Sequence, residues 1–372
     1  MFDLAPMKAS APAEDVTRST GNPRNSEGSF LRLRDGRIAF AYSRYRGNSA
    51  DDHAYAEIAA VFSSDDGETF GDERILVRPR LEEQYDETNC MSVTLMRLGN
   101  GDVGLFYLLK RHNVVSEYLL RRSTDEMETF GEPVLCVADD MPGYYVVNND
   151  RVVRMSNGRL IVPAAHHPSA MGHHGKVSCD GRANAAFYAS DDDGMTWRRI
   201  SAMLALPGGA YSGTGLQEPG LIELTPGVLY AYFRTDLGRQ YESVSVDGGA
   251  SWFPVQPSRF TSPASPLLIK RNEYSGKLYA VWNPVPEYYG RPRAKVWTGG
   301  RNPLVIAEGV FDAGGIRWGA PRVIEDNPEA GFCYPAVYFL SETEAVLSYC
   351  AGGVDPADEM CLVRTRIRKI TL

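Results

Sequence analysis

Residues 190–197 read SDDDGMTW, and the same kind of octapeptide recurs at other places along the chain. The other clear copies are SSDDGETF at 63–70, STDEMETF at 123–130 and SVDGGASW at 245–252, and a weaker one is FDAGGIRW at 311–318. Asp and Gly suit a tight turn, a Ser or Thr hydroxyl can bond the turn backbone, and the closing aromatic side chain packs beneath it. We interpret the octapeptide as a clasp that closes a β-hairpin and carries no chemistry of its own.

A second repeat interleaves with the octapeptides. Each copy is an apolar run, a polar turn such as Asp35-Gly36 or Asn157-Gly158, and another apolar run, and such turns are the strongest short signals of a β-hairpin. The six copies are Phe30–Ser43, Val93–Leu108, Val152–Ala165, Leu221–Phe233, Leu267–Trp282 and Ala336–Tyr349. Radial repetition of four-stranded units predicts an all-β, six-bladed β-propeller with antiparallel blades. Two β-sandwiches, the alternative, would give no reason for a sixfold repeat.

The composition narrows the class of protein. The 372 residues are 43% hydrophobic and 23% charged, as in an ordinary globular chain, and we expect residues 1–20 as an N-terminal extension and 21–372 as one propeller domain. The formal net charge of -8 disfavours a nucleic-acid partner, and no apolar run reaches the roughly 20 residues that span a membrane. The N-terminus lacks the apolar core of a signal peptide and the six cysteines are scattered, so we expect a cytoplasmic protein with reduced thiols.

The octapeptide is similar to the Asp-box of BNR-repeat proteins, and the chain from about Arg24 onward resembles the sialidase (neuraminidase) superfamily of six-bladed propellers, including bacterial exo-α-sialidases. LQEPGLIEL at 216–224 and YFRTD at 232–236 resemble the sialidase segments in which a glutamate opens a strand and an arginine closes the hairpin, here Glu218 and Arg234. GFCYPAV at 331–337 resembles the segment of the tyrosine nucleophile, here Tyr334. GRNPLVI at 300–306 resembles the segment of the last arginine of the sialidase triad, here Arg301.

Two N-terminal segments extend the resemblance. PRNSEGSF at 23–30 lies where sialidases have an arginine-isoleucine-proline motif, which implies Arg24 as the first arginine of the triad. The isoleucine-proline is missing here, and Glu27 is a candidate for a role that typical sialidases lack. The segment Asp51-Asp52-His53 resembles the loop of the general acid. Spacing slightly favours Asp51, the doublet leaves Asp52 open, and His53 is a candidate for sugar binding.

The resemblance implies a glycoside hydrolase that removes terminal sialic acid, a 2-keto-3-deoxy sugar acid, with retention. Three arginines would hold the substrate carboxylate with planar donor forks. Tyr334 would be the nucleophile, because a neutral phenol avoids the repulsion that a carboxylate nucleophile would meet from the substrate. Glu218 would be its base, and Asp51 or Asp52 would protonate the leaving oxygen.

Other residues at hairpin ends are candidates for sugar binding. Asp150 opens the third hairpin, His166 ends it, and Trp282 ends the fifth, where an indole can stack on a sugar ring. The pairs His166-His167 and His173-His174 are more typical of a solvated loop than of a metal site, so we expect no metal or other cofactor. Two alternatives remain open: a hydrolase or lyase for a different acidic sugar, and a non-catalytic propeller that binds glycans. Each has an acidic sugar or sialoglycan as its partner.

Overall fold

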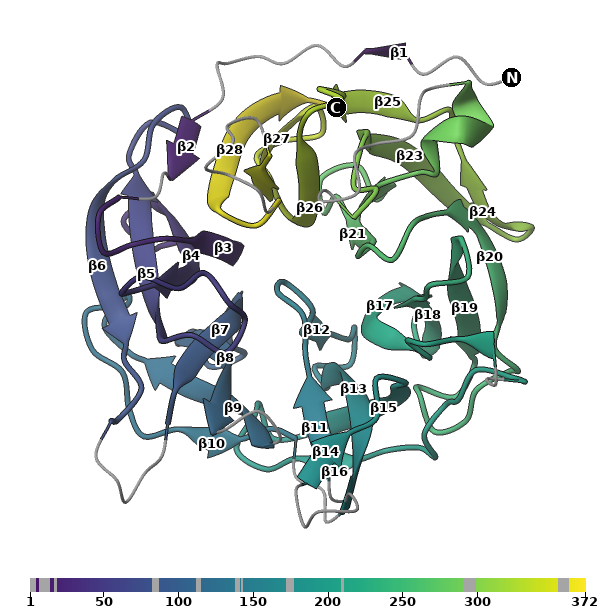
Figure 1. Ribbon diagram of the computed structural model, residues 1–372, viewed down its shortest axis with the longest axis horizontal. Coiled ribbons are helices and arrows are strands. Elements are labelled where there is room, and N and C mark those ends of the chain that lie inside the picture. Colours follow the sequence, from purple (N-terminus) through teal and green to yellow (C-terminus); the bar gives the residue numbers. More distant parts are fainter. Residues whose placement is uncertain are drawn as a thin grey trace.

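The structure, a computed structural model, describes residues 5–6, 14–16, 19–81, 87–111, 115–137, 141, 143–171, 177–208, 211–290, 299–353 and 361–372. Its β-sheets are arranged around a central axis like the blades of a propeller (Figure 1). Within those ranges there is no α-helix, and no helix is long and apolar enough to cross a bilayer; η2 (Pro286–Tyr289) is a short 3-10 helix. The all-β, propeller-like prediction is therefore confirmed.

The blades are antiparallel sheets whose strands are numbered from the axis outward. The first two groups are β3 (Asn25–Arg32), β4 (Ile38–Tyr45), β5 (Ala56–Ser63) and β6 (Gly71–Val77), then β7 (Asn89–Arg97), β8 (Val103–Arg111), β9 (Val115–Ser123) and β10 (Val134–Leu135). A single parallel pair, Ala56 with Asn89, joins these two groups into one eight-stranded sheet. The prediction of six separate blades stays a prediction.

The other four sheets continue around the ring. The third consists of β11 (Gly143–Val146), β12 (Val153–Arg154), β13 (Leu160–Met171), β14 (Val177–Cys179), β15 (Asn184–Ser190) and β16 (Arg198–Arg199). The next is β17 (Gln217–Thr225), β18 (Val228–Arg234), β19 (Arg239–Ser245) and β20 (Gln256–Thr261). The last two are β21 (Leu268–Arg271), β22 (Leu278–Trp282), β23 (Leu304–Asp312), β24 (Gly315–Trp318) and β25 (Arg322–Glu325), then β26 (Gly331–Phe339), β27 (Glu344–Gly352) and β28 (Arg364–Thr371).

Part of the N-terminal extension joins the sheets. β2 (Glu14–Val16) pairs antiparallel with β28, and β1 (Ala5–Pro6) pairs parallel with β25. Both short strands lie toward the outside of the ring, β2 next to the sheet that contains the C-terminus and β1 next to the sheet before it (Figure 1). All six cysteines are free thiols.

The four clear octapeptides form the predicted clasps. In the first, the Asp65 carboxylate accepts hydrogen bonds from Thr69 N at 2.9 Å, Thr69 Oγ1 at 2.6 Å and Ser63 Oγ at 2.7 Å. The closing aromatic packs against a neighbouring strand: Trp252 stacks on Phe187 with ring centroids 4.4 Å apart. These bonds hold the pKa of Asp65, and of its counterparts Asp125, Asp192 and Asp247, at about 2.

Substituting a clasp aspartate should change stability rather than chemistry. Asp192→Ala removes the acceptor for Thr196 and Ser190, so we expect the Tm at pH 7 to fall by a few degrees. Because the folded-state pKa of Asp192 is depressed from 3.8 to about 2, the carboxylate stabilises the fold above pH 3.8 and loses that effect as pH falls through 2. The Tm values of wild type and variant should therefore converge in acid. A Tm difference that is constant from pH 7 to pH 2 would contradict this.

Candidate active site

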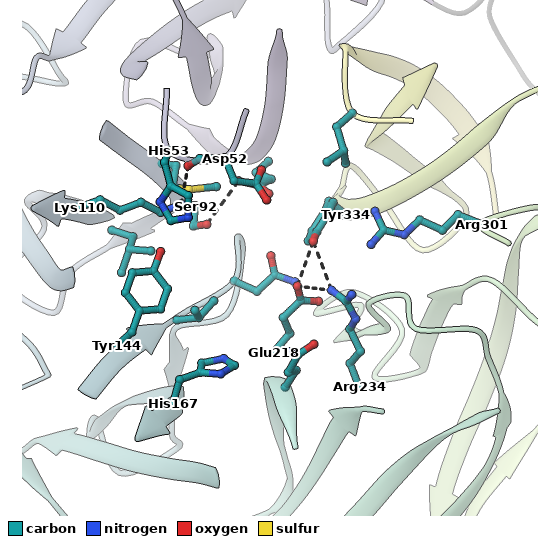
Figure 2. Close-up of a pocket in the computed structure, with 17 residues that line it drawn as sticks. Asp52, His53, Ser92, Lys110, Tyr144, His167, Glu218, Arg234, Arg301 and Tyr334 are labelled. Atoms are coloured by element: carbon teal, nitrogen blue, oxygen red, sulfur yellow. Dashed lines mark hydrogen bonds and ion pairs between the residues drawn. The ribbon is translucent and has the colours of Figure 1, made fainter. Parts of the chain in front are cut away.

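A cavity of about 300 Å³ opens at the axis, where the innermost strands of several blades begin (Figure 2). Its lining is rich in carboxylates, cations and hydrogen-bonding rings. The lining residues are Glu27, Asp52, His53, Met91, Ser92, Leu108, Lys110, Tyr144, Val146, Asn148, His167, Gln217, Glu218, Arg234, Arg301, Tyr334 and Leu362. Residues far apart in the sequence thus meet here because the ring brings the strand starts to one axis.

Four lining residues lie at the same kind of backbone irregularity, a β-bulge near the start of an innermost strand. Glu27, Ser92, Glu218 and Tyr334 have φ angles of 59, 56, 45 and 53°, and the ladder register shifts at each of them. A bulge takes a side chain out of the strand's alternation and re-aims it, and a left-handed conformation costs a residue other than glycine about 1–3 kcal/mol. The fold accepts this strain in β3, β7, β17 and β26, and the four side chains line the cavity.

The bulge in β17 depends on the glycine that follows it. A Cβ atom on Gly220 would overlap the ring of Tyr232, which is buried and whose hydroxyl accepts a hydrogen bond from Ile269 N at 3.0 Å. Gly220→Ala should therefore lower the free energy of unfolding by about 1–3 kcal/mol, the usual cost of overpacking. Chemical denaturation measures this, with Gly71→Ala as the control, because a Cβ atom on Gly71 meets nothing within 4 Å. Equal stabilities of the two variants would contradict the packing argument.

Tyr334 and Glu218 are in direct contact although they lie in different blades. Tyr334 Oη donates a hydrogen bond to Glu218 Oε1 at 2.9 Å. Arg234 Nη1 donates to the same oxygen at 2.6 Å and lies 3.4 Å from Tyr334 Oη (Figure 2). A phenol next to a carboxylate has a base in position to take its proton, which is how a weak hydroxyl nucleophile is activated.

The surroundings keep Tyr334 neutral until a base acts. Burial raises the pKa of its hydroxyl well above the ordinary value, the Glu218 charge raises it further, and Arg301 and Arg234 oppose this. The Arg301 guanidinium lies 5.3 Å from the centre of the Tyr334 ring, and its Nη1 is 3.2 Å from Cys333 Sγ. Two guanidiniums therefore flank the phenol, and both line the cavity, where they can hold an anion.

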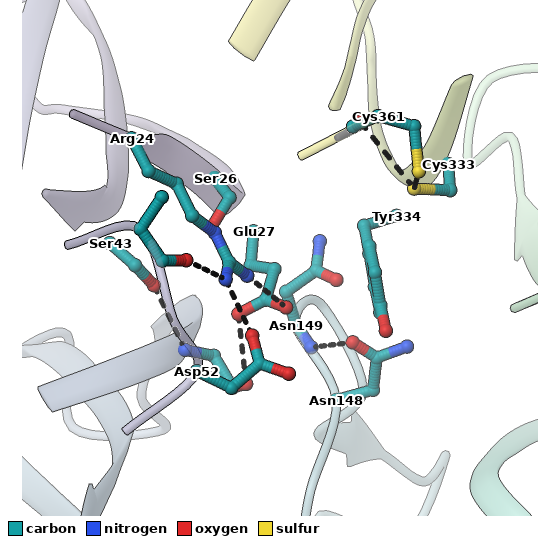
Figure 3. A network of polar contacts seen from close by, with 12 residues as sticks. Arg24, Ser26, Glu27, Ser43, Asp52, Asn148, Asn149, Cys333, Tyr334 and Cys361 are labelled. Carbon is teal, nitrogen blue, oxygen red and sulfur yellow. Dashed lines mark hydrogen bonds and ion pairs between the residues drawn. The ribbon is translucent and has the colours of Figure 1, made fainter. Parts of the chain in front are cut away.

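Arg24 lies beside the cavity but is engaged by protein groups (Figure 3). It is fully buried, and its Nη1 donates to Asp52 Oδ1 at 2.5 Å and to Ala50 O at 3.1 Å. Its Nε donates to Ser26 Oγ at 3.1 Å, and Nη2 lies 3.6 Å from Glu27 Oε1. Arg24 is not among the lining residues, so a clamp of three arginines stays a prediction.

The structure separates the two aspartates of the acid loop. Asp52 lines the cavity, with a side chain that is 58% exposed, whereas Asp51 accepts a hydrogen bond from His53 N at 2.9 Å and is not among the lining residues. Desolvation in the cavity raises the pKa of Asp52, but the Arg24 guanidinium and Lys110 outweigh it and hold that pKa below its usual value. His53 also lines the cavity, and burial together with Lys110 lowers its pKa.

Lys110, Tyr144 and His167 are among the lining residues that the sequence analysis missed. Lys110 Nζ donates to Asp52 O at 2.6 Å and lies 5.9 Å from the centre of the Tyr144 ring. His167 Nδ1 lies 2.9 Å from Asp180 O, and since a carbonyl only accepts, this nitrogen carries the proton and Nε2 is an acceptor when the ring is neutral. Lys110 could have been predicted from its position in the sequence. It lies near the end of β8, the second strand of a hairpin, just as Arg234 lies at the end of β18, the second strand of another hairpin.

Residues 148–151, between β11 and β12, cross the axis and form what we name the axial plug. Asn149 Nδ2 donates to Gly28 O at 2.8 Å, and Arg151 Nη2 donates to Leu267 O at 2.6 Å. Asp150 accepts from Ser29 Oγ at 3.1 Å and pairs with Lys270 Nζ at 2.8 Å. Asn148 faces the active-site cavity, whereas Asp150 lines a different cavity of about 490 Å³. The candidate Asp150 therefore lies outside the site, where the charge of Lys270 holds it.

Two further candidates lie in the blade interior. His166 is buried, and the centre of its ring lies 4.7 Å from that of Tyr145. Because side chains alternate between the two faces of β13, it is His167 that lines the cavity. Trp282 is buried and packs edge-to-face on Phe260 with centroids 5.0 Å apart. His173 and His174 lie outside the described residues. Among the residues that are described, no group of three or more His, Cys, Asp or Glu side chains is placed to hold a metal ion.

Comparisons with known proteins agree with this architecture. The family model described as BNR repeat-like domain matches residues 38–346. The anhydrosialidase of Macrobdella decora is 28% identical over 199 residues, which are 52% of this chain and 23% of that protein. The NanB sialidase of Streptococcus pneumoniae has a TM-score of 0.68 at 13% identity over 98% of this chain and 70% of its own. A leech intramolecular trans-sialidase, in complex with 2,7-anhydro-Neu5Ac, has a TM-score of 0.69 at 13% identity over 96% and 69%.

The structural likenesses concern the fold, and the curated relative is matched over less than a quarter of its length. The family model, in contrast, covers most of this chain, including all four clear clasps. The predicted resemblance to BNR-repeat proteins of the sialidase superfamily is thereby confirmed, and the chain belongs to the BNR repeat-like domain family.

Proposed function

We propose that the protein is a glycoside hydrolase that removes a terminal sialic acid with retention of configuration. The observation that carries this proposal is the 2.9 Å contact between Tyr334 Oη and Glu218 Oε1 in a cavity that two guanidiniums also line. A binding module needs no activated phenol, and a substrate without a negative charge needs no pair of half-buried arginines in its cavity. The activated phenol and the two arginines together suit a sugar that has a carboxylate on its reacting carbon, because a neutral nucleophile avoids charge repulsion with that carboxylate.

In the first step of the proposed reaction, the bond from Tyr334 Oη to the anomeric carbon forms while the glycosidic bond breaks. The phenol proton passes to Glu218. Asp52 is ionised in the free site because its pKa is lowered, so it must take up a proton from solvent as the substrate binds before it can give that proton to the leaving oxygen. Asp52 is favoured over Asp51 because it lines the cavity. In the second step water attacks the anomeric carbon and the bond from that carbon to Tyr334 Oη breaks. The Asp52 carboxylate takes a proton from the water, and Glu218 returns its proton to Tyr334 Oη.

The outcome of the second step is open to experiment. One relative is an anhydrosialidase, and one structural neighbour is an intramolecular trans-sialidase in complex with 2,7-anhydro-Neu5Ac. If a hydroxyl of the bound sugar attacks in place of water, the product is an anhydro sugar rather than the free acid. Chromatography and mass spectrometry of the product distinguish the two outcomes, because the anhydro sugar is lighter by one water.

A screen of the purified protein against fluorogenic sialosides and uronides tests the proposal. We expect release from a sialoside and loss of release in Tyr334→Phe. Release from a uronide alone would replace sialic acid by another acidic sugar. Binding of acidic sugars without any turnover would leave a non-catalytic glycan-binding propeller.

The second candidate function, action on a different acidic sugar, is favoured by one observation. Arg24 donates to Asp52 at 2.5 Å and lies 3.6 Å from Glu27, so two carboxylates compete with a substrate for the third arginine. With Arg24 engaged in this way, Arg234 and Arg301 are the two arginines that line the cavity and can hold the carboxylate of an acidic sugar. The uronide arm of the screen decides between the two sugars.

We also infer that the ring has six blades. The eight-stranded sheet divides at its only parallel pair into β3–β6 and β7–β10, and each half is an antiparallel unit like the others. An experimental structure that showed strand pairing across the whole of that division would contradict this count.

A further inference from the structure

Glu27 is a buried carboxyl group whose contacts with cations are long. Its side chain is 5% exposed, and the nearest cationic atom recorded for it among the described residues is Arg24 Nη2 at 3.6 Å. Ser92 Oγ lies 3.4 Å from Glu27 Oε2, at the outer limit for a hydrogen bond. Arg24 itself makes its shortest bond to Asp52, and Lys110 Nζ makes its bond to a backbone carbonyl. Glu27 nevertheless lines the cavity, on the same kind of bulge as Glu218 and Tyr334.

We propose that Glu27 couples ligand binding to proton uptake, so that the site takes an acidic sugar together with a proton that Glu27 holds. The inference rests on the proposed function in one respect, that the ligand is an acidic sugar. It makes Glu27 a specificity-determining residue: in its protonated form it is neutral and can donate a hydrogen bond to the ligand, whereas in its ionised form it repels the ligand's carboxylate.

The electrostatics of the cavity support the proposal. Burial raises the pKa of Glu27 to about 7, Asp52 and Glu218 act in the same direction, and Arg24 and Lys110 oppose them. A sphere with the volume of the cavity, about 300 Å³, is roughly 8 Å across. Two unit charges that far apart, at an effective dielectric constant of about 20, repel enough to raise the proton affinity of a carboxyl roughly 30-fold. A bound carboxylate should therefore recruit a proton to Glu27 at neutral pH.

The other titratable and charged groups that face Glu27 do not change their charge over the same pH range as Glu27. Asp52 has a lowered pKa and stays ionised, while His53 and His167 have lowered pKa values and are neutral above pH 7. Arginine stays charged throughout, and burial raises the pKa of Tyr334. Burial lowers the pKa of Lys110, so its titration would weaken anion binding at the alkaline end in wild type and in a Glu27 variant alike. Only the difference between the two proteins therefore reports on Glu27.

Titration calorimetry with N-acetylneuraminic acid, and separately with glucuronic acid, tests the proposal. The measurement is made in two buffers of different ionisation enthalpy, from pH 5 to pH 9. For wild type we expect uptake of roughly 0.7 proton near pH 7.5, and an affinity that falls roughly 20-fold between pH 6 and pH 9. Glu27→Gln, which resembles the protonated side chain, should bind without that uptake. Glu242→Gln is the matched control, a half-buried glutamate outside the cavity that accepts from Tyr230 Oη at 2.6 Å, and should behave like wild type.

The outcomes separate this inference from the proposed function. Binding by wild type without proton uptake, or uptake that persists in Glu27→Gln, overturns the inference and leaves the proposed function intact. If neither acid binds at any pH, the proposed function fails, and a measurement without ligand decides the premise about Glu27. The raised pKa means that the folded state binds more protons than the unfolded state between pH 4.5 and about 7. Wild type should therefore lose stability relative to Glu27→Gln as pH rises through that range, and parallel Tm curves would overturn the inference.

Discussion

Tyr334→Phe should lower kcat by about 1,000-fold or more, because it removes the oxygen that forms the proposed covalent bond. The ring and its contact with Arg301 remain, and Arg234 keeps its bond to Glu218. The variant should therefore still bind the product acid with an affinity close to that of wild type. Steady-state kinetics on the best substrate from the screen, together with titration of the product acid, measure the two effects separately.

Tyr349→Phe provides the matched control for this change. Tyr349 lies on the neighbouring strand β27 and also donates to a glutamate, Glu325, at 2.6 Å, but it is not among the cavity-lining residues. Loss of its hydroxyl should lower the Tm and leave kcat of the folded protein nearly unchanged. Unchanged turnover in Tyr334→Phe would exclude Tyr334 as the nucleophile, and loss of activity in both variants would point to a folding defect.

Arg301→Lys should raise KM about 100-fold with a smaller effect on kcat. Lysine keeps the charge but loses the planar fork that pairs with a carboxylate and the stacking contact with Tyr334. Each hydrogen bond to a charged group contributes roughly 1.5–3 kcal/mol, so the loss of one or two such bonds gives an effect of this size. Because Arg301 makes no hydrogen bond to Glu218 that the structure records, the nucleophile and its base should stay in contact.

Arg366→Lys is the corresponding control outside the cavity. Arg366 pairs with Asp15 and Glu325 on the outer strands, so its substitution should affect stability alone. A KM that does not change in Arg301→Lys would show that Arg301 does not hold the substrate carboxylate. A fall in kcat without a change in KM would instead place the effect of Arg301 on Tyr334.

Much of the architecture was predictable because the signals are local. The clasp residues bond within eight positions of the chain, so sequence alone identifies Asp65 and its partners. Glu218, Arg234, Arg301 and Tyr334 were predictable because their segments resemble sialidase segments. Glu218 and Tyr334 lie near the start of an innermost strand, Arg234 ends a second strand and Arg301 precedes β23, and these strand termini of a closed ring meet at the axis. Their placement in one cavity follows from that topology, whereas their roles remain to be tested.

Three candidates lie outside the cavity because of features that are not local. His166 and His167 differ by one position, and only the register of β13 against β11 and β15 decides which of them faces the cavity. Asp150 opens a hairpin as predicted, but its side chain turns to the other end of the axis, toward Lys270, 120 residues later. Trp282 ends its hairpin in a place that the Phe260 ring already fills. Each of these outcomes depends on a partner from another strand or blade.

The axial plug affects how a glycan could enter the active-site cavity. The described residues 148–151 bridge to β3, to the residue before β21 and to Lys270 of β21, so they lie between the active-site cavity, which Asn148 lines, and the second cavity, which Asp150 lines. Under the proposed function, we therefore expect that a glycan does not thread between the two cavities and that its sugar reaches Tyr334 from the side of the active-site cavity. In that case the active-site cavity would hold one terminal sugar unit, and the rest of the glycan would remain outside. Substrate and product would then use the same opening, so the released acid would have to leave before the next glycan end could enter.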